Sequence, residues 1–152
     1  MANEIEGLII KKLRIIPDER GSVMHMIKKS DEGFKNFGEV YFATAYPGVI
    51  KGWHLHKKQT QNYCVIKGMV KIVIYDSREN STTFRNLREI FIGEKNFCLV
   101  TIPPLVHNGW KCISEKEAIL ANFTDYEHDP HEMTRLDPFS KDIPYSWELK
   151  NK

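Results

Sequence analysis

Short stretches of alternating apolar and polar residues fill most of this chain, and they restrict its fold more than any other feature. Turn signals separate them roughly every 8 to 12 residues, among them residues 93–96 (GEKN) and the Pro103-Pro104 pair. Alternation with a period of two is typical of strands with one buried face, whereas helical periodicity is nowhere strong. Many short strands with frequent turns predict an all-β sandwich or barrel.

The expected strands can be placed from this pattern. Extended segments are predicted over residues 7–16, 22–27, 39–46, 62–66, 69–76, 89–92, 97–102, 109–113 and 118–124. In one of them Val70, Ile72 and Ile74 share a face. Lys67-Gly68 predicts a hairpin turn, and residues 30–37 form a loop or a short helix. From about residue 127 the chain is polar and interrupted by prolines, which predicts an irregular tail over the surface.

Size and charge favour a single domain, over residues 1–152, that does not bind nucleic acid. The 152 residues include 22 basic and 20 acidic side chains, and the net charge of +2 is too small to attract a polyanion by bulk electrostatics. No apolar run approaches the roughly 18 residues of a membrane span, and the N-terminus lacks the pattern of a signal peptide. We therefore expect a cytoplasmic protein without a membrane partner.

The three cysteines, Cys64, Cys98 and Cys112, indicate the same compartment. They are odd in number, show no CxxC spacing, and each lies in an apolar stretch. Buried reduced thiols are therefore the favoured interpretation.

Residues 48–68 (GVIKGWHLHKKQTQNYCVIKG) contain the strongest candidate for a functional site. In an extended strand His54 and His56 point the same way, while Trp53 and Leu55 point the other way. Two imidazoles on one face of a strand, followed by a pair of lysines, predict the floor of an active site inside a β-barrel. The alternative is a pair of hydrogen-bonded core histidines.

This segment resembles the first motif of the cupins, and a later segment echoes their second motif. The first match consists of Gly48, His54, His56, Gln61 and Gly68, with Gln61 in place of the usual glutamate, and the second of Gly93, Pro103 and His107. Within the cupins the chain is most similar to the dTDP-4-dehydrorhamnose 3,5-epimerases, through DERG at 18–21, GVIKGWHLH at 48–56, IPPLVHNGW at 102–110 and FTDY at 123–126. HLHKK also resembles a segment of the sugar-nucleotide 3,4-ketoisomerases.

The resemblance implies a cupin jelly-roll barrel that forms a homodimer, needs no cofactor and binds a nucleoside-diphospho-4-keto-6-deoxyhexose. His54 falls on the catalytic base of the family, and Lys51 on the arginine that contacts the diphosphate. Arg20 falls on the N-terminal arginine that reaches the nucleotide, often across the dimer. The N-terminal strands, over about residues 7–27, are accordingly candidates for exchange between subunits.

Three positions depart from the family pattern. Ala121 occupies the position of the catalytic tyrosine, and Gln61 that of a lysine near the enolate oxygen. The histidine of the second motif aligns with Asn108, which leaves His107 one place early and on the opposite face of an extended strand.

The chemistry implied by the family is removal of a proton next to a ketone by a neutral histidine, with a donor on the enolate oxygen. Return of the proton from the opposite face inverts the carbon and needs a second acid, which Ala121 cannot supply. Tyr63 and Tyr126 are the candidates for that acid, with Tyr41 as a third. We therefore expect an isomerase, either an epimerase or a ketoisomerase, in cell-surface polysaccharide biosynthesis.

Two other functions stay open at this point. A non-catalytic sugar-nucleotide-binding cupin also fits Ala121 and Gln61. A metal-dependent cupin enzyme could use His54, His56 and His107, although glutamine is a weak fourth ligand. The predicted substrate-binding set is Arg20, Lys51, His56, Gln61, His107, Asn108 and Trp110, of which Trp110 either stacks on the base or sugar or packs in the core.

Overall fold

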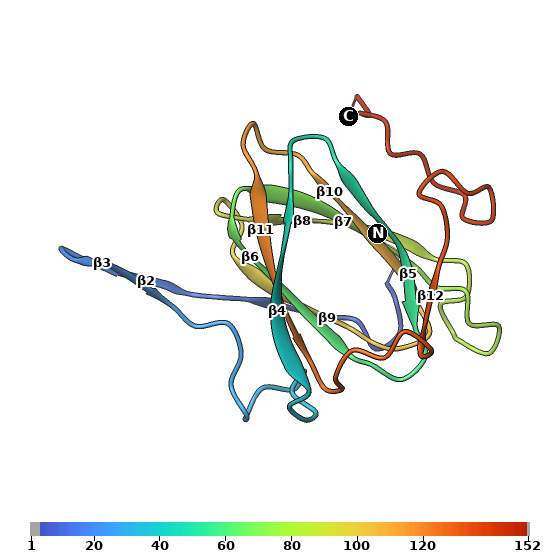
Figure 1. Ribbon diagram of the computed structural model, residues 1–152, viewed down its shortest axis with the longest axis horizontal. Coiled ribbons are helices and arrows are strands. Elements are labelled where there is room, and N and C mark those ends of the chain that lie inside the picture. The colour runs from blue at the N-terminus through green and yellow to red at the C-terminus, as the bar shows by residue number, and fades with distance from the viewer. Residues whose placement is uncertain (1–3, 152) are drawn as a thin grey trace.

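The computed structural model describes residues 4–151, which form two facing β-sheets and a projecting hairpin (Figure 1). These residues contain strands and no helix, so the predicted all-β class is confirmed and residues 30–37 form a loop. The strands are β1 (Ile9–Lys12), β2 (Ile15–Asp18), β3 (Gly21–Met24), β4 (Glu39–Ala45), β5 (Ile50–His56), β6 (Gln61–Lys67), β7 (Met69–Tyr75), β8 (Leu87–Gly93), β9 (Cys98–Ile102), β10 (His107–Cys112), β11 (Ala118–Thr124) and β12 (Met133–Arg135).

The two sheets have five antiparallel strands each. Their orders are β1-β9-β6-β11-β4 and β12-β5-β10-β7-β8, while β2 and β3 pair only with each other and extend away from the barrel (Figure 1). Successive strands from β4 to β7, and again from β8 to β12, alternate between the sheets. This alternation makes the jelly-roll barrel that the cupin resemblance implies.

The hairpin predicted at Lys67-Gly68 is wrong. β6 pairs with β9 and β11, whereas β7 pairs with β8 and β10, so the turn carries the chain from one sheet to the other. Gly68 has a φ of +77°, a conformation that favours glycine, and a Cβ there would lie 3.1 Å from the Cα of Ala118. The turn is therefore tight, as the sequence predicts. The two strands that flank it do not pair, because their buried faces pack against each other across the core.

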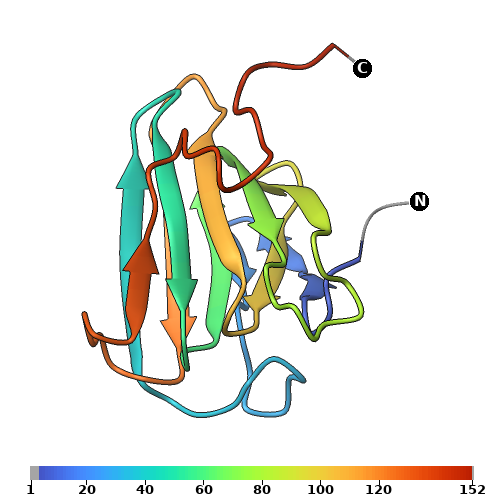
Figure 2. The same ribbon diagram turned by 90° about the vertical axis from the view of Figure 1, so that its right-hand side faces the viewer.

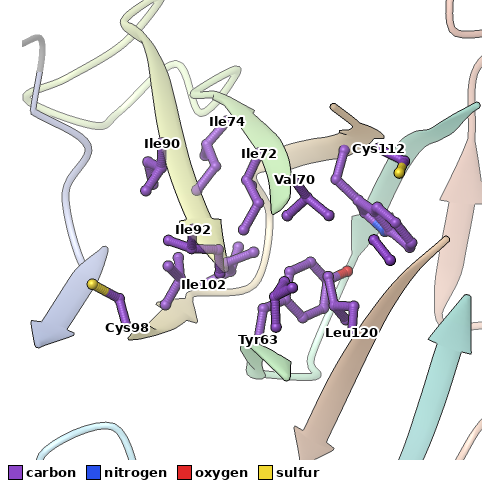
Figure 3. Close-up of a cluster of buried hydrophobic side chains, with 14 of the residues drawn as sticks. Tyr63, Val70, Ile72, Ile74, Ile90, Ile92, Cys98, Ile102, Cys112 and Leu120 are labelled. Atoms are coloured by element: carbon purple, nitrogen blue, oxygen red, sulfur yellow. The ribbon is translucent and has the colours of Figure 1, made fainter. Parts of the chain in front are cut away.

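Apolar side chains fill the space between the sheets on the side of β7, β8 and β9. Val70, Ile72 and Ile74 are fully buried there, as their alternation predicts, and each contributes roughly 1.5–3 kcal/mol by leaving water. Figure 3 shows them with Tyr63 and Leu120, which belong to the same cluster. Beyond these two residues the barrel opens into a cavity.

The C-terminal segment is more ordered than the polar tail that its composition predicts. β12 pairs with β5 and sets Arg135 opposite His54 (Figure 2). Further along, Tyr145 and Trp147 pack against Trp53, with 5.1 Å between the centroids of the two tryptophan rings. Trp53 points out of the barrel, as its alternation with His54 predicts, and the tail covers this apolar surface.

The N-terminal hairpin exposes apolar side chains. Ile15, Ile16 and Val23 keep 44%, 46% and 55% of their surface exposed, and the exchange of this region between subunits stays a prediction. All three cysteines are buried and unpaired, as expected. Within residues 4–151 there is no helix long and apolar enough to span a membrane.

Candidate active site

A cavity of about 460 Å³ lies between the two sheets. One wall comes from β5, β10 and β12, and the other from β4, β6 and β11. The wall of β5 contributes Lys51, His54 and His56, and the facing wall contributes Tyr41 and Tyr63. The structure therefore brings the two histidines into one cavity with two tyrosine side chains from the facing sheet.

A shift in register places Lys51 on the same side of β5 as the histidines. His54 lies opposite Asn108 and Lys51 opposite Trp110, so three steps along β5 match two steps along β10. An extra residue of this kind reverses the alternation of a strand. As a result Lys51 faces the cavity, and its Nζ lies 5.6 Å from the ring centroid of Trp110, which also lines it.

His54 is held in its neutral form. Burial lowers the pKa of its imidazole to about 4, and the positive charges of Arg135, His56 and Lys51 act in the same direction. No side chain among residues 4–151 hydrogen-bonds to the His54 ring. At neutral pH the ring therefore offers a lone pair to whatever occupies the cavity.

His56 has a carboxylate partner that the sequence did not reveal. Its Nδ1 hydrogen-bonds to Oε1 of Glu132, and the backbone N–H groups of Lys57 and Lys58 donate to Oε2 at 2.9 and 3.1 Å. Burial raises the pKa of Glu132, but the hydrogen bonds outweigh burial and the net pKa is lowered. Glu132 lies 76 residues from His56 in a polar segment, and only the pairing of β12 with β5 brings them together.

Three polar side chains form a buried chain of hydrogen bonds beside the histidines. The hydroxyl of Tyr63 donates to Oδ1 of Asn108 at 3.1 Å, and Nδ2 of Asn108 donates to Oε1 of Gln61 at 3.0 Å. Burial strongly raises the pKa of Tyr63, so the hydroxyl keeps its proton. Asn108 is thus the inward residue of β10, while His107 faces away and pairs through Nδ1 with Ser77 at 3.0 Å.

The facing wall contains Ala121, which stands at the position of the family's tyrosine. Ala121 does not line the cavity, whereas Leu120 before it does. Tyr41 lines it from β4, and its hydroxyl accepts a hydrogen bond from Nδ2 of Asn122 at 2.8 Å. Burial raises the pKa of Tyr41, which keeps this hydroxyl protonated too. Tyr126 is 52% exposed and lies outside the cavity lining.

The cationic residues fall into two groups. Lys51 and Arg135 line the cavity, and Arg135 was not anticipated because β12 was not predicted. Arg20 lies at the tip of the projecting hairpin, where its guanidinium pairs with Asp18 at 2.6 Å and its side chain is 84% exposed. It does not line the cavity of its own chain.

The histidines of the metal hypothesis do not converge. His107 faces away from the cavity that His54 and His56 line, and Nδ1 of His56 is occupied by Glu132. Among the residues with described positions, no group of three His, Cys, Asp or Glu side chains could hold a metal ion. The cavity is instead rich in amides, hydroxyls and cationic side chains.

Fold and cavity together define a cupin-type jelly roll with a histidine-lined pocket. The sequence model of dTDP-4-dehydrorhamnose 3,5-epimerase matches residues 2–152, and the chain belongs to this family of sugar-nucleotide epimerases. It is 31% identical to the spore coat polysaccharide biosynthesis protein SpsL of Bacillus subtilis, over 95% of this chain and 92% of that protein. It is 33% identical to a probable low-salt glycan biosynthesis epimerase of Haloferax volcanii, over 93% and 88%. A crystal structure of a dTDP sugar isomerase from Desulfovibrio desulfuricans superposes with a TM-score of 0.91 at 37% identity, covering 94% of this chain and 92% of that one.

Proposed function

We propose that this protein epimerises or isomerises a nucleoside-diphospho-4-keto-6-deoxyhexose in the synthesis of a polysaccharide or glycan. The observation that carries the proposal is His54, a neutral imidazole without a side-chain partner that shares a cavity with two protonated tyrosines, Tyr41 and Tyr63, of the facing sheet. Family membership supports the substrate class, and the names of the relatives support the pathway.

His54 is the base in this mechanism. Its ring takes the proton from a carbon next to the C4 ketone, the electron pair of that C–H bond forms a carbon–carbon double bond, and the carbonyl pair moves onto oxygen. A pKa of about 4 makes His54 a weak base in the empty protein. The diphosphate of a substrate next to Lys51 and Arg135 would offset the positive charges that lower this pKa, so binding strengthens the base.

The acid that returns a proton to the opposite face comes from β4 or β6. Tyr63 directs its hydroxyl proton to Asn108, whereas the Tyr41 oxygen accepts from Asn122 and leaves its own proton available. We therefore favour Tyr41 as the acid, with Tyr63 as the alternative. Gln61 and Trp110, which line the cavity, are assigned to sugar binding, and Lys51 to the diphosphate. Asn108 lies outside the lining and is assigned to the positioning of Gln61, to which it donates.

Arg20 can serve the nucleotide only from another copy of the chain. The hairpin extends away from its own barrel (Figure 1), and its tip keeps the guanidinium exposed. We propose a homodimer in which each hairpin reaches the pocket of its partner. Mixing Arg20→Ala with His54→Ala should then restore part of the activity, because a mixed dimer contains one complete site; no recovery after subunit exchange would refute the shared site.

The test of the function is solvent deuterium exchange. Wild-type protein in D₂O should incorporate deuterium at C3 or C5 of a dTDP-, CDP- or GDP-linked 4-keto-6-deoxyhexose, and His54→Ala should abolish the incorporation. Movement of the ketone to C3 without inversion would identify a ketoisomerase. Nucleotide binding without exchange in the wild type would instead identify a non-catalytic binding protein.

A further inference from the structure

The cavity wall of β5 holds a second imidazole with a carboxylate partner. His56 and Glu132 are 7% and 8% exposed, their side chains hydrogen-bond through Nδ1 and Oε1, and His56 lines the cavity beside His54. We propose that His56, positioned by Glu132, is a second catalytic residue that donates a hydrogen bond from Nε2 to the oxygen of the enolate. This inference rests on the proposed function, in which His54 is the base.

The surroundings of Glu132 fix the proton positions on His56. Oε2 already accepts from the backbone N–H groups of Lys57 and Lys58, and the strand pairing of Met133 with His56 holds the two segments in register. A carboxylate can only accept, so Nδ1 of His56 is the donor of their shared hydrogen bond. Nε2 is therefore the ring nitrogen left for a ligand, and in the proposed step it carries the second proton of an imidazolium, whose positive charge Glu132 offsets.

The reaction needs such a donor because negative charge develops on the ketone oxygen. Gln61, which stands where the family has a lysine, is neutral, and its Oε1 accepts from Asn108. A charged donor stabilises an oxyanion more than a neutral amide does. His56 lies two residues from His54 along the strand, about 7 Å in backbone rise, so both rings can address one sugar ring.

Protons and electron pairs balance in this step. The substrate proton moves to His54, the C–H electron pair becomes the new carbon–carbon bond, and the carbonyl electron pair moves to oxygen. Nε2–H of His56 hydrogen-bonds to that oxygen, and the Nδ1 proton stays in the bond with Glu132. Reprotonation of the carbon reverses the electron flow and restores the ketone.

The test compares His56→Gln and Glu132→Gln with a matched control. Glutamine at position 56 leaves a neutral donor, and glutamine at position 132 keeps an acceptor for Nδ1 but removes the charge. Each variant should lower kcat about 100-fold with KM changed less than about threefold, because one charged donor to the oxyanion is lost. The double variant should fall no further, since the two residues act as one unit. Glu127→Gln, an exposed carboxylate of the same segment, should keep wild-type kcat.

Deuterium incorporation separates this inference from the proposed function. The rate of incorporation should fall with kcat in both variants, while a circular dichroism melt of His56→Gln remains within a few degrees of the wild type. If both single variants exchange deuterium at the wild-type rate while His54→Ala still abolishes exchange, the role of His56 is overturned and the proposed function stands. Additive losses in the double variant would overturn the pairing with Glu132. No exchange by the wild-type protein with any of these substrates would overturn both the inference and the proposed function.

Discussion

The low pKa of His54 predicts an acid destabilisation that a single substitution removes. The folded protein holds the imidazole at a pKa of about 4, against about 6.5 in an unfolded chain. Between these values the unfolded state binds more protons, so the free energy of unfolding falls as the pH is lowered from about 6.5 towards 4. The difference between the two pKa values corresponds to a loss of at most about 3 kcal/mol in the free energy of unfolding. The loss is smaller where solvent screens the ring, and the His54 ring is partly accessible from the cavity.

Urea denaturation of His54→Gln and wild type at pH 7 and at pH 4.5 measures this effect. As the pH is lowered from 7 to 4.5, the free energy of unfolding of the wild type should fall by about 2 kcal/mol more than that of the variant. This comparison does not depend on the stability of the variant at pH 7. Carboxylates such as Glu132 titrate in both proteins and cancel in the difference. His25→Gln, at an exposed histidine, provides the control and should follow the wild-type pH dependence.

A direct reading of the same quantity comes from NMR. The ring C–H resonances of His54 should titrate with a midpoint near pH 4, and Arg135→Met should raise that midpoint, because Arg135 is the leading charged cause of the shift. A midpoint at or above 6, or parallel pH profiles of His54→Gln and His25→Gln, would refute the reasoning. In that case burial and the neighbouring positive charges would not hold the pKa of His54 below its ordinary range, and the acid destabilisation would have another cause.

Four further substitutions, with one control, test the site and the tail. Tyr41→Phe should block inversion by about 100-fold or more while deuterium exchange continues, whereas Tyr63→Phe should mainly lower stability by about 1–3 kcal/mol, because Asn108 loses its donor; equal kinetic effects of both would contradict the assignment of Tyr41. Lys51→Met should raise KM about tenfold or more with little change in kcat, and an unchanged KM would remove Lys51 from the diphosphate site. Trp147→Ala should cost about 3–5 kcal/mol in chemical denaturation, compared with less than about 0.5 for Leu149→Ala, which is 95% exposed; similar values would show that the tail does not stabilise the barrel.

Alternation along single strands was sufficient to predict one wall of the site. Val70, Ile72 and Ile74 face the core, and His54 and His56 share the cavity face, because the period of a strand is a local property. The likeness of short motifs to a known family supplied the jelly-roll class. Neither prediction required knowledge of which strands are neighbours.

The parts that the sequence did not predict all depend on pairing between distant segments. Glu132 and Arg135 enter the site because β12 pairs with β5, and the polar composition around them gives no local sign of a strand. Lys51 faces the cavity through a register shift against β10. The turn at Gly68 has the local chemistry of a hairpin, yet the partners of β6 and β7 are chosen by the packing of the whole core.

The arrangement of the two walls determines which reaction the pocket can support. His54 and His56 lie on the wall of β5, whereas Tyr41 and Tyr63 lie on the facing sheet. In the proposed mechanism a sugar ring held between the walls loses its proton towards β5. Return from the facing wall inverts the carbon, and return from the same wall preserves it or moves the ketone. Ala121 does not line this space, so its lack of a hydroxyl does not remove an acid from the pocket. In the proposed mechanism the choice between epimerase and ketoisomerase therefore depends on the tyrosines of β4 and β6.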